Sequence, residues 1–222
     1  MGQNIAVVGA GLMGSAIVTR LLERGHAVQV FDIDAARIVS LAARGARPAS
    51  SIAEASRNSD FIILSLNHAD TVRKAVFGEH GIASAATPDK LVIDMSSIDP
   101  AATVAIATWL LNETGMRWVD CPLSGGVPGV LGGKLIIMTG GDESDFERTH
   151  VVMKDLAANY TLMGSLGVGQ TTKFVNPLFC ALALQAVAEA MKLAEAGGVD
   201  AKKIPGAWRV VVPTVASCRS SW

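Results

Sequence analysis

The feature that most constrains the fold is a glycine-rich turn near the start of the chain, in the segment VVGAGLMG (Val7–Gly14). Its glycines Gly9, Gly11 and Gly14 are spaced as G-x-G-x-x-G and follow an apolar run typical of a buried strand. In such a turn the first glycine allows a sharp bend, the second lets a pyrophosphate approach, and the third lets helix and strand pack closely. Because the helix N-terminus then faces the phosphates, the pattern predicts a strand–turn–helix unit that binds a dinucleotide.

The end of the next expected strand supports this interpretation. Asp32 follows the run Ala27–Phe31, where an acidic side chain would bind the ribose hydroxyls of the adenosine half. No arginine follows Asp32 immediately to hold a 2′-phosphate, so the sequence favours NAD over NADP. The alternative role for Asp32 is that of a solvated residue that caps the next helix.

Short runs rich in Val and Ile alternate with helical stretches along most of the chain, which is typical of βαβ units and a parallel sheet. The expected strands are Asn4–Val8, Ala27–Phe31, Phe61–Leu66, Leu91–Asp94, Arg117–Asp120 and Lys134–Thr139. The expected helices are Met13–Arg24, Ala35–Arg44, Ile52–Arg57, Asp70–Phe77, Pro100–Thr114 and Glu143–Asp155. We therefore predict an α/β fold of the Rossmann type, with a doubly wound, mostly parallel sheet in a dinucleotide-binding domain over residues 1–164.

A long apolar helix is expected after this domain. From Gly169 to Ala196 the sequence is dominated by Ala, Leu, Met and Glu, and Gly197–Gly198 then ends the run. Such a helix is too apolar to stand alone in water, so its partner is another helix, from this chain or from a second copy. A membrane span is disfavoured, because Phe174–Ala194 includes Asn, Pro, Gln, Glu and Lys. Residues 165–204 are expected to form this interdomain helix and the start of an incomplete all-α second domain.

Composition narrows the class of protein further. Half of the 222 residues are hydrophobic, 18% are charged and the formal net charge is −1, which indicates a globular protein with a well-buried core. Without a Lys/Arg cluster, nucleic acid is not an expected partner. Cys121, Cys180 and Cys218 have no metal-ligand spacing and cannot all pair within the chain, which favours a cytoplasmic setting. We expect no targeting segment, since no basic stretch precedes the first apolar run.

Two loops at strand ends carry small polar residues. In the segment DCPLSGG, Ser124 offers a hydroxyl, and Gly125 and Gly126 leave backbone N–H groups open for a carboxylate. A sharp turn is the alternative role for the two glycines. Ser96 and Ser97 follow another strand, and their hydroxyls should face nicotinamide and substrate, because ligands of parallel sheets sit at carboxyl strand ends. They could instead cap the next helix.

Lys173 lies one turn into the long helix, with Asn176 three residues further on the same face. Removing a hydride from an alcohol requires a base for the hydroxyl proton, and the reverse reduction requires an acid. Since the reference pKa of lysine is about 10.4, a base active at neutral pH would need roughly 4 kcal/mol of desolvation or like-charge neighbours. Closure by a second domain would supply this. The alternative is an ordinary surface lysine.

Taken together, these motifs resemble the β-hydroxyacid dehydrogenase family. The resemblance covers residues 1 to about 204, and the matching segments in order are VVGAGLMG, FD, IDMSSIDP, DCPLSGG, GVGQTTKFVN and AEAGGVD. It implies an NAD-dependent oxidoreductase of a small 3-hydroxy acid such as 3-hydroxyisobutyrate. The alternatives are tartronate semialdehyde or glyoxylate reduction, and a non-catalytic NAD-binding module. A homo-oligomer that associates through the long helix and the complete second domain is also implied.

The resemblance also implies residue roles. Ser124, Gly125 and Gly126 hold the substrate carboxylate. Lys173 is then the catalytic acid/base, and Asn176 orients the substrate or the lysine. The implied cofactor-binding residues are Gly9, Ala10, Gly11, Leu12, Met13, Gly14, Asp32, Leu66, Asn67 and Ser97.

The chain departs from the family pattern at several places. Ala10 is a mild change in the first turn, Asn67 stands where a proline is frequent, and Pro177 follows Asn176. Pro177 removes an amide and can kink the helix beside the polar partner of Lys173. The last segment, residues 205–222, does not continue the family's helical second domain. A shift of two bases within suitable codons would restore a similar sequence, so we expect an aberrant, out-of-frame tail.

Overall fold

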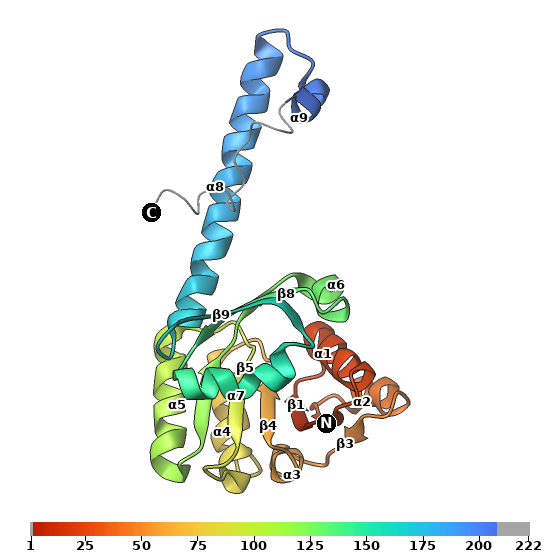
Figure 1. Cartoon of the computed structure of the whole chain (residues 1–222), viewed down its shortest axis with the longest axis vertical. Coiled ribbons are helices and arrows are strands. Elements are labelled where there is room, and N and C mark those ends of the chain that lie inside the picture. The colour runs from red at the N-terminus through yellow and green to blue at the C-terminus, as the bar shows by residue number, and fades with distance from the viewer. Residues whose placement is uncertain (1, 208–222) are drawn as a thin grey trace. The chain divides into compact units, whose positions relative to one another are not determined.

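The computed structural model describes residues 2–207, and the chain forms two compact units, Met1–Val175 and Asn176–Trp222. Most of the expected aberrant tail, residues 208–222 with Cys218, lies outside the described residues. Within the described part of the first unit, a nine-stranded sheet has the order β3-β2-β1-β4-β5-β6-β8-β7, and β9 pairs with β8. Figure 1 labels several of these strands, namely β1, β3, β4, β5, β8 and β9. Because the order reverses direction between β1 and β4, a crevice is expected at their carboxyl ends.

The strands are β1 (Asn4–Val8), β2 (Ala27–Phe31), β3 (Arg47–Pro48), β4 (Phe61–Leu64), β5 (Leu91–Asp94), β6 (Arg117–Asp120), β7 (Leu123–Ser124), β8 (Leu135–Gly140) and β9 (Ala157–Gly164). The helices of the first unit are α1 (Leu12–Glu23), α2 (Ala35–Ala42), α3 (Ile52–Arg57), α4 (Ala69–Phe77), the 3₁₀ helix η1 (Ile82–Ala85), α5 (Pro100–Thr114), α6 (Gly126–Leu131) and α7 (Glu143–Met153). The strands from β3 to β6 pair in parallel, whereas β8 is antiparallel to β6 and β7.

All six expected strands and all six expected helices are present, with ends that differ by one or two residues at most. Two local assignments were wrong, one of a loop and one of a strand end. Ser124 ends the short strand β7, since it pairs with Ile136 of β8, and Gly126 begins α6. Leu66 and Asn67 lie beyond the end of β4, because the backbone N–H of Leu66 donates to the Ser96 side chain rather than to a neighbouring strand.

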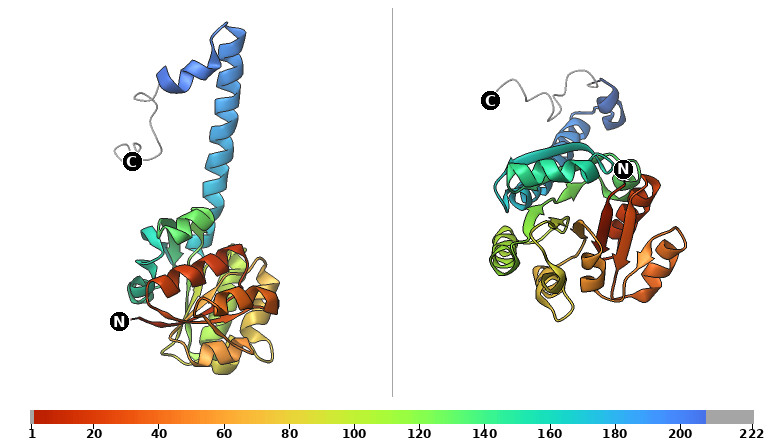
Figure 2. Two further views of the ribbon diagram at one scale, coloured as in Figure 1. Left: turned by 90° about the vertical axis from the view of Figure 1, so that its right-hand side faces the viewer. Right: turned by 60° about the horizontal axis from the view of Figure 1, so that its bottom comes forward.

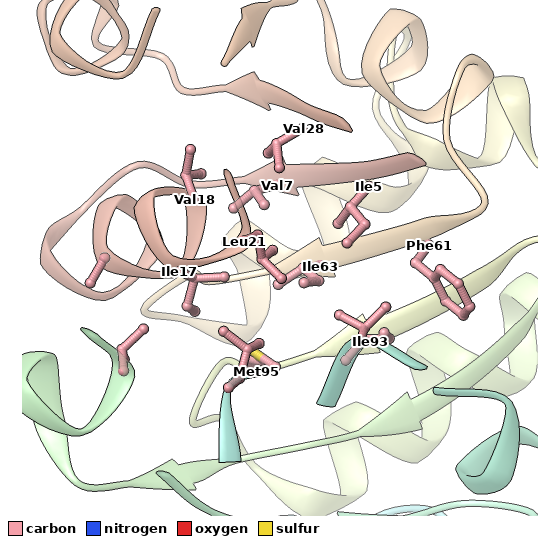
Figure 3. Close-up of a cluster of buried hydrophobic side chains, with 14 of the residues drawn as sticks. Ile5, Val7, Ile17, Val18, Leu21, Val28, Phe61, Ile63, Ile93 and Met95 are labelled. Carbon is pink, nitrogen blue, oxygen red and sulfur yellow. The ribbon is translucent and has the colours of Figure 1, made fainter. Parts of the chain in front are cut away.

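The core has one hydrophobic cluster on each face of the sheet. Along β1, Ile5 and Val7 belong to one cluster, whereas Ala6 and Val8 belong to the other, as the alternation of side chains along a strand requires. Figure 3 shows the first cluster, in which side chains of β1, β2, β4 and β5 meet those of α1. Helices α4 and α5 cover the opposite cluster, so helices lie on both faces (Figure 2). The prediction of a doubly wound, mostly parallel sheet is therefore confirmed.

The long helix is α8 (Val168–Ala196), and it continues through Pro177 into the second unit, where η2 (Ala201–Lys203) and α9 (Ile204–Ala207) follow it. Its large apolar side chains beyond residue 176 are 58–76% exposed, namely Leu178, Phe179, Leu182, Leu184, Val187 and Leu193. Among the described residues, α8 is the one helix that is long and apolar enough to cross a membrane. Length and composition alone do not distinguish α8 from the core helix of a soluble protein. Its polar residues include Gln185, whose amide donates to Glu189 one turn later.

Candidate cofactor and substrate site

A cavity of about 800 Å³ lies where β1, β4 and β5 end. This is the place at which ligands bind to doubly wound sheets. The residues that line it are Ala10, Gly11, Leu12, Met13, Ser15, Arg37, Ser65, Leu66, Asn67, Met95, Ser96, Ser97 and Leu123. The structure thus brings together seven of the predicted cofactor-binding residues, from three separate segments of the sequence. The volume lies in the range that small-molecule and cofactor sites have in proteins.

The three glycines of the first turn occupy different environments. Gly9 has a φ of 98°, which side chains rarely adopt, and a Cβ on it would overlap the carbonyl oxygen of Ser65. A Cβ on Gly14 would overlap the carbonyl oxygen of Gly9, so α1 could not approach β1. A Cβ on Gly11 would meet no atom within 4 Å, and it would project into open space at the cavity. The turn therefore has the open cradle that a pyrophosphate requires.

Asp32 supports the glycine turn directly. Its Oδ2 accepts a hydrogen bond of 2.6 Å from the backbone N–H of Ala10, and its Oδ1 accepts one of 2.8 Å from Asp34. The side chain is only 6% exposed and does not line the cavity. The alternative role as the cap of the next helix was wrong, because Asp34 caps α2 by accepting from the N–H of Ala36. Ribose binding by Asp32 stays a prediction.

Arg37 is a residue of the cavity wall that the sequence reasoning missed. Its Nε lies 3.2 Å from Oδ2 of Asp34, and its Nη1 lies 3.7 Å from Oδ2 of Asp32. The first turn of α2 brings the guanidinium back towards the end of β2. The sequence contained a signal for Arg37, namely its place in the first turn of the helix that follows β2. A side chain in that turn can reach the end of the preceding strand, as Asp32 directly after the strand does.

The loop after β5 forms the next part of the wall. Ser96 and Ser97 both line the cavity, and the backbone N–H of Leu66 donates to Ser96 Oγ over 3.1 Å. Their alternative role as helix caps was wrong, because Asp99 caps α5 by accepting from the N–H of Ala102. The hydroxyls of Ser96 and Ser97 therefore do not cap α5, and both residues lie at the predicted cofactor position.

The predicted carboxylate cradle lies next to the cavity. Leu123 lines the cavity, whereas Ser124, Gly125 and Gly126 are not among its lining residues. Gly125 and Gly126 have φ values of 126° and 61°, so both hold a left-handed backbone that favours glycine. The turn alternative explains these two glycines, and their role in substrate binding stays a prediction.

Lys173 lies in the first turns of α8, and its side chain is half-buried. Among the described residues, no carboxylate pairs with its ammonium group and no hydrogen-bond partner fixes it. Asp120 at the end of β6 holds the start of this helix, because its two oxygens accept from the N–H groups of Gly167 over 2.7 Å and Gln170 over 2.8 Å. Asn176 belongs to the second unit, and its predicted role beside Lys173 stays a prediction.

These features define an α/β protein with a dinucleotide-type turn at the switch point of its sheet. Residues 4–164 match the family described as the NAD binding domain of 6-phosphogluconate dehydrogenase. The chain is 37% identical over 203 residues to 2-hydroxy-3-oxopropionate reductase of Escherichia coli (strain K12), covering 90% of this chain and 68% of that protein. It is 33% identical over 204 residues to the probable mitochondrial 3-hydroxyisobutyrate dehydrogenase of Dictyostelium discoideum, covering 92% of this chain and 63% of that protein.

A solved structure gives the same result. The 3-hydroxyisobutyrate dehydrogenase of Mycobacterium tuberculosis, described with L-serine, is 30% identical and superposes with a TM-score of 0.89 over 99% of this chain and 74% of that chain. The chain therefore belongs to the β-hydroxyacid dehydrogenase family, within the group that has the NAD(P)-binding domain of 6-phosphogluconate dehydrogenase. It spans 63% to 68% of the length of the two curated relatives.

Proposed function

We propose that this protein is an NAD-dependent oxidoreductase of a small 3-hydroxy acid, most like 3-hydroxyisobutyrate. The observation that carries the proposal is the open position beside Gly11, at a cavity of about 800 Å³, in a chain of this family. Ala10 to Met13 would receive the pyrophosphate at the N-terminus of α1. Leu66, Asn67 and Ser97 would lie along the cofactor towards the nicotinamide.

The chemistry divides between cofactor and chain. When bound, the nicotinamide cofactor would supply the acceptor for the hydride of the alcohol carbon, and in its reduced form the hydride donor for the reverse reaction. The amine of Lys173 takes the hydroxyl proton during oxidation and returns it to the carbonyl oxygen during reduction. Ser124, Gly125 and Gly126 hold the substrate carboxylate, and Asn176 orients the substrate or the lysine. In this arrangement, removal of the amine affects turnover rather than cofactor binding.

We favour NAD over NADP on the charges at the ribose end. Among the described residues that line the cavity, Arg37 is the cation, and it already lies against the carboxylates of Asp34 and Asp32. Two carboxylates and one guanidinium leave a net negative charge, which would repel a 2′-phosphate. NAD lacks that phosphate.

Two other functions have support. The reductase has the higher identity of the two curated relatives, which favours tartronate semialdehyde or glyoxylate as the substrate. Two observations favour a non-catalytic NAD-binding module. Lys173 has no partner among the described residues, and Pro177 lies in the same helix, α8. These alternatives differ in turnover and in substrate preference, so kinetics separate them.

The test combines binding and turnover for the wild type, Lys173→Met and a control, Lys192→Met, on the same helix. We expect NAD affinity to stay within about twofold in both variants. Turnover of 3-hydroxyisobutyrate should fall by about 10²-fold or more only in Lys173→Met. NAD binding without turnover on 3-hydroxyisobutyrate, glyoxylate or tartronate semialdehyde would favour the binding module. Faster turnover of either semialdehyde-type substrate would favour the reductase.

We also propose that a second copy of the chain covers α8, in a cytoplasmic homo-oligomer. The apolar side chains of this helix are exposed over many turns. A continuous apolar surface of this kind in contact with water is unfavourable and is typical of a protein–protein interface. The molar mass from light scattering should therefore exceed that of one chain at micromolar concentration. A monomer at these concentrations would contradict the proposal.

A further inference from the structure

Gln170 is a buried polar side chain for which the function proposed above has no role. It is 1% exposed, yet both ends of its amide are paired. Its Nε2 donates to the backbone carbonyl of Ser96 over 2.8 Å, and its Oε1 accepts from the backbone N–H of Ile98 over 3.4 Å. A buried amide with both groups paired has a fixed orientation.

The two partners of this amide flank one residue of the cofactor cavity. Ser97 lies between Ser96 and Ile98, and its neighbour Ser96 also receives the N–H of Leu66 from the loop after β4. Gln170 therefore holds the backbone on both sides of Ser97. The loss of these two hydrogen bonds would alter the wall of the cavity at Ser97.

The backbone of Gln170 is held as firmly as its side chain. Its N–H donates to Oδ2 of Asp120 over 2.8 Å, and the N–H of Gly167 donates to Oδ1 of the same carboxylate over 2.7 Å. Gly169 between them packs so closely on Met138 and Gly140 that a Cβ would overlap their backbone. The start of α8 is therefore fixed to the carboxyl ends of β6 and β8.

Lys173 follows Gln170 by three residues, which is less than one turn of helix and about 4.5 Å of rise. The two side chains consequently leave α8 on the same face, about one turn apart. The lysine itself has no partner among the described residues, so the position of its amine depends on the helix that carries it. Gln170 is the side chain that joins this helix to the loop around Ser97.

We propose that Gln170 is a positioning residue that fixes Lys173 relative to the Ser96–Ile98 loop of the cofactor site. The catalytic meaning of this link rests on the function proposed above, whereas the link itself does not. Its loss should loosen two things together: the environment of the Lys173 amine and the cavity wall at Ser97.

The test uses the whole chain and the variant Gln170→Met, which keeps the volume of the side chain and removes both hydrogen bonds. The first readout is the acetylation rate of Lys173 by acetic anhydride, measured by mass spectrometry relative to Lys192 in the same molecule. We expect this ratio to change by at least threefold without cofactor. The second readout is the Kd of NAD, which should rise about tenfold. Thr171→Ala, on the exposed side of the same turn, should leave both values unchanged.

Gln170→Glu keeps the test decisive if Gln170→Met does not fold. A protonated carboxyl can donate to Ser96 and accept from Ile98, whereas a carboxylate cannot donate. NAD binding by Gln170→Glu should therefore approach that of the wild type at pH 5.5 and be weaker than that of the wild type at pH 8. Among the described residues, Asp94 and Asp120 are the other carboxyls at this edge of the sheet. Wild-type values of both readouts in folded Gln170→Met, or pH-independent wild-type binding in Gln170→Glu, would overturn the inference. If the wild type binds no NAD, the proposed function fails, while the Lys173 to Lys192 ratio still decides the inference.

Discussion

Asp94 and Asp120 lie opposite each other, in register, at the carboxyl ends of β5 and β6, but their hydrogen bonds differ. Asp120 uses both oxygens to hold the start of α8. Asp94 is fully buried, its Oδ1 accepts from the N–H of Ser96, and its Oδ2 has no partner among the described residues. Burial, and to a smaller extent the charge of Asp120, raise the pKa of Asp94 to about 7.

This pKa predicts a pH-dependent stability. In the unfolded chain Asp94 has a pKa of about 3.9, so between about pH 4 and pH 7 the folded state binds a proton that the unfolded state has lost. Stability should therefore fall as the pH rises through this window, by about 4 kcal/mol from this group. Asp94→Asn removes the penalty, so it should stabilise the protein at pH 8 and have little effect at pH 4.

Urea unfolding at both pH values checks this prediction. The exposed Asp70 gives a matched control, since Asp70→Asn should change stability little at either pH. An effect of Asp94→Asn that is the same at pH 4 and at pH 8 would show that folding does not raise the pKa of this carboxyl.

The glycine turn predicts opposite outcomes for two alanine substitutions. Gly14→Ala places a Cβ against the carbonyl of Gly9, so it should destabilise the fold by about 2 kcal/mol or more. Gly11→Ala places its Cβ in open space at ordinary backbone angles, so stability should change by less than about 0.5 kcal/mol. NAD affinity should nevertheless fall by about tenfold or more in Gly11→Ala, because the methyl group occupies the phosphate position. Thermal unfolding and NAD titration measure the two effects, and a stable Gly11→Ala with normal NAD affinity would place the phosphates elsewhere.

Charge at the ribose end predicts a change in cofactor preference. Asp34→Ser keeps a side chain that can cap α2 but frees Arg37 from its nearest carboxylate. The ratio of the NADP Kd to the NAD Kd should then fall by about tenfold, which corresponds to about 1.4 kcal/mol. The double variant Asp34→Ser with Arg37→Met should restore the original ratio. If the single variant leaves the ratio unchanged, Arg37 does not face the 2′ position.

Lys90 does not line the cavity, and its contacts predict an effect on stability alone. Its Nζ donates to the backbone carbonyls of Ser56, Arg57 and Ser59 over 2.7 to 2.8 Å, where α3 ends. Lys90→Met keeps the apolar stem but leaves these acceptors without the ammonium, which should cost about 2 kcal/mol of unfolding free energy. The exposed Lys74→Met serves as the control. Denaturant unfolding provides the measurement, and equal stability of the two variants would contradict this capping role.

Much of the fold was predictable because the strands of a parallel sheet are continuous apolar runs. Ile5 to Val8 and Phe61 to Leu64 are buried on both faces, so their composition alone marks them as strands. Strand β9 was missed for the opposite reason, since its residues are largely exposed or half-buried and its pairing with β8 stabilises it. Short strands such as β3 and β7 carry too few residues for any pattern.

The sequence by itself determined the glycine turn, the acid after β2 and the lysine helix, because each depends on residues close together in the chain. Only the tertiary structure decided how these parts are held. Asp32 accepts a hydrogen bond from Ala10 in the glycine turn, and Arg37 lines the cavity. The side chain of Gln170 is hydrogen-bonded to the backbone on both sides of Ser97. The partners of Gln170 lie more than seventy residues away in the sequence. A hydrogen bond depends on distance and direction in space, and spacing along the chain carries no record of either.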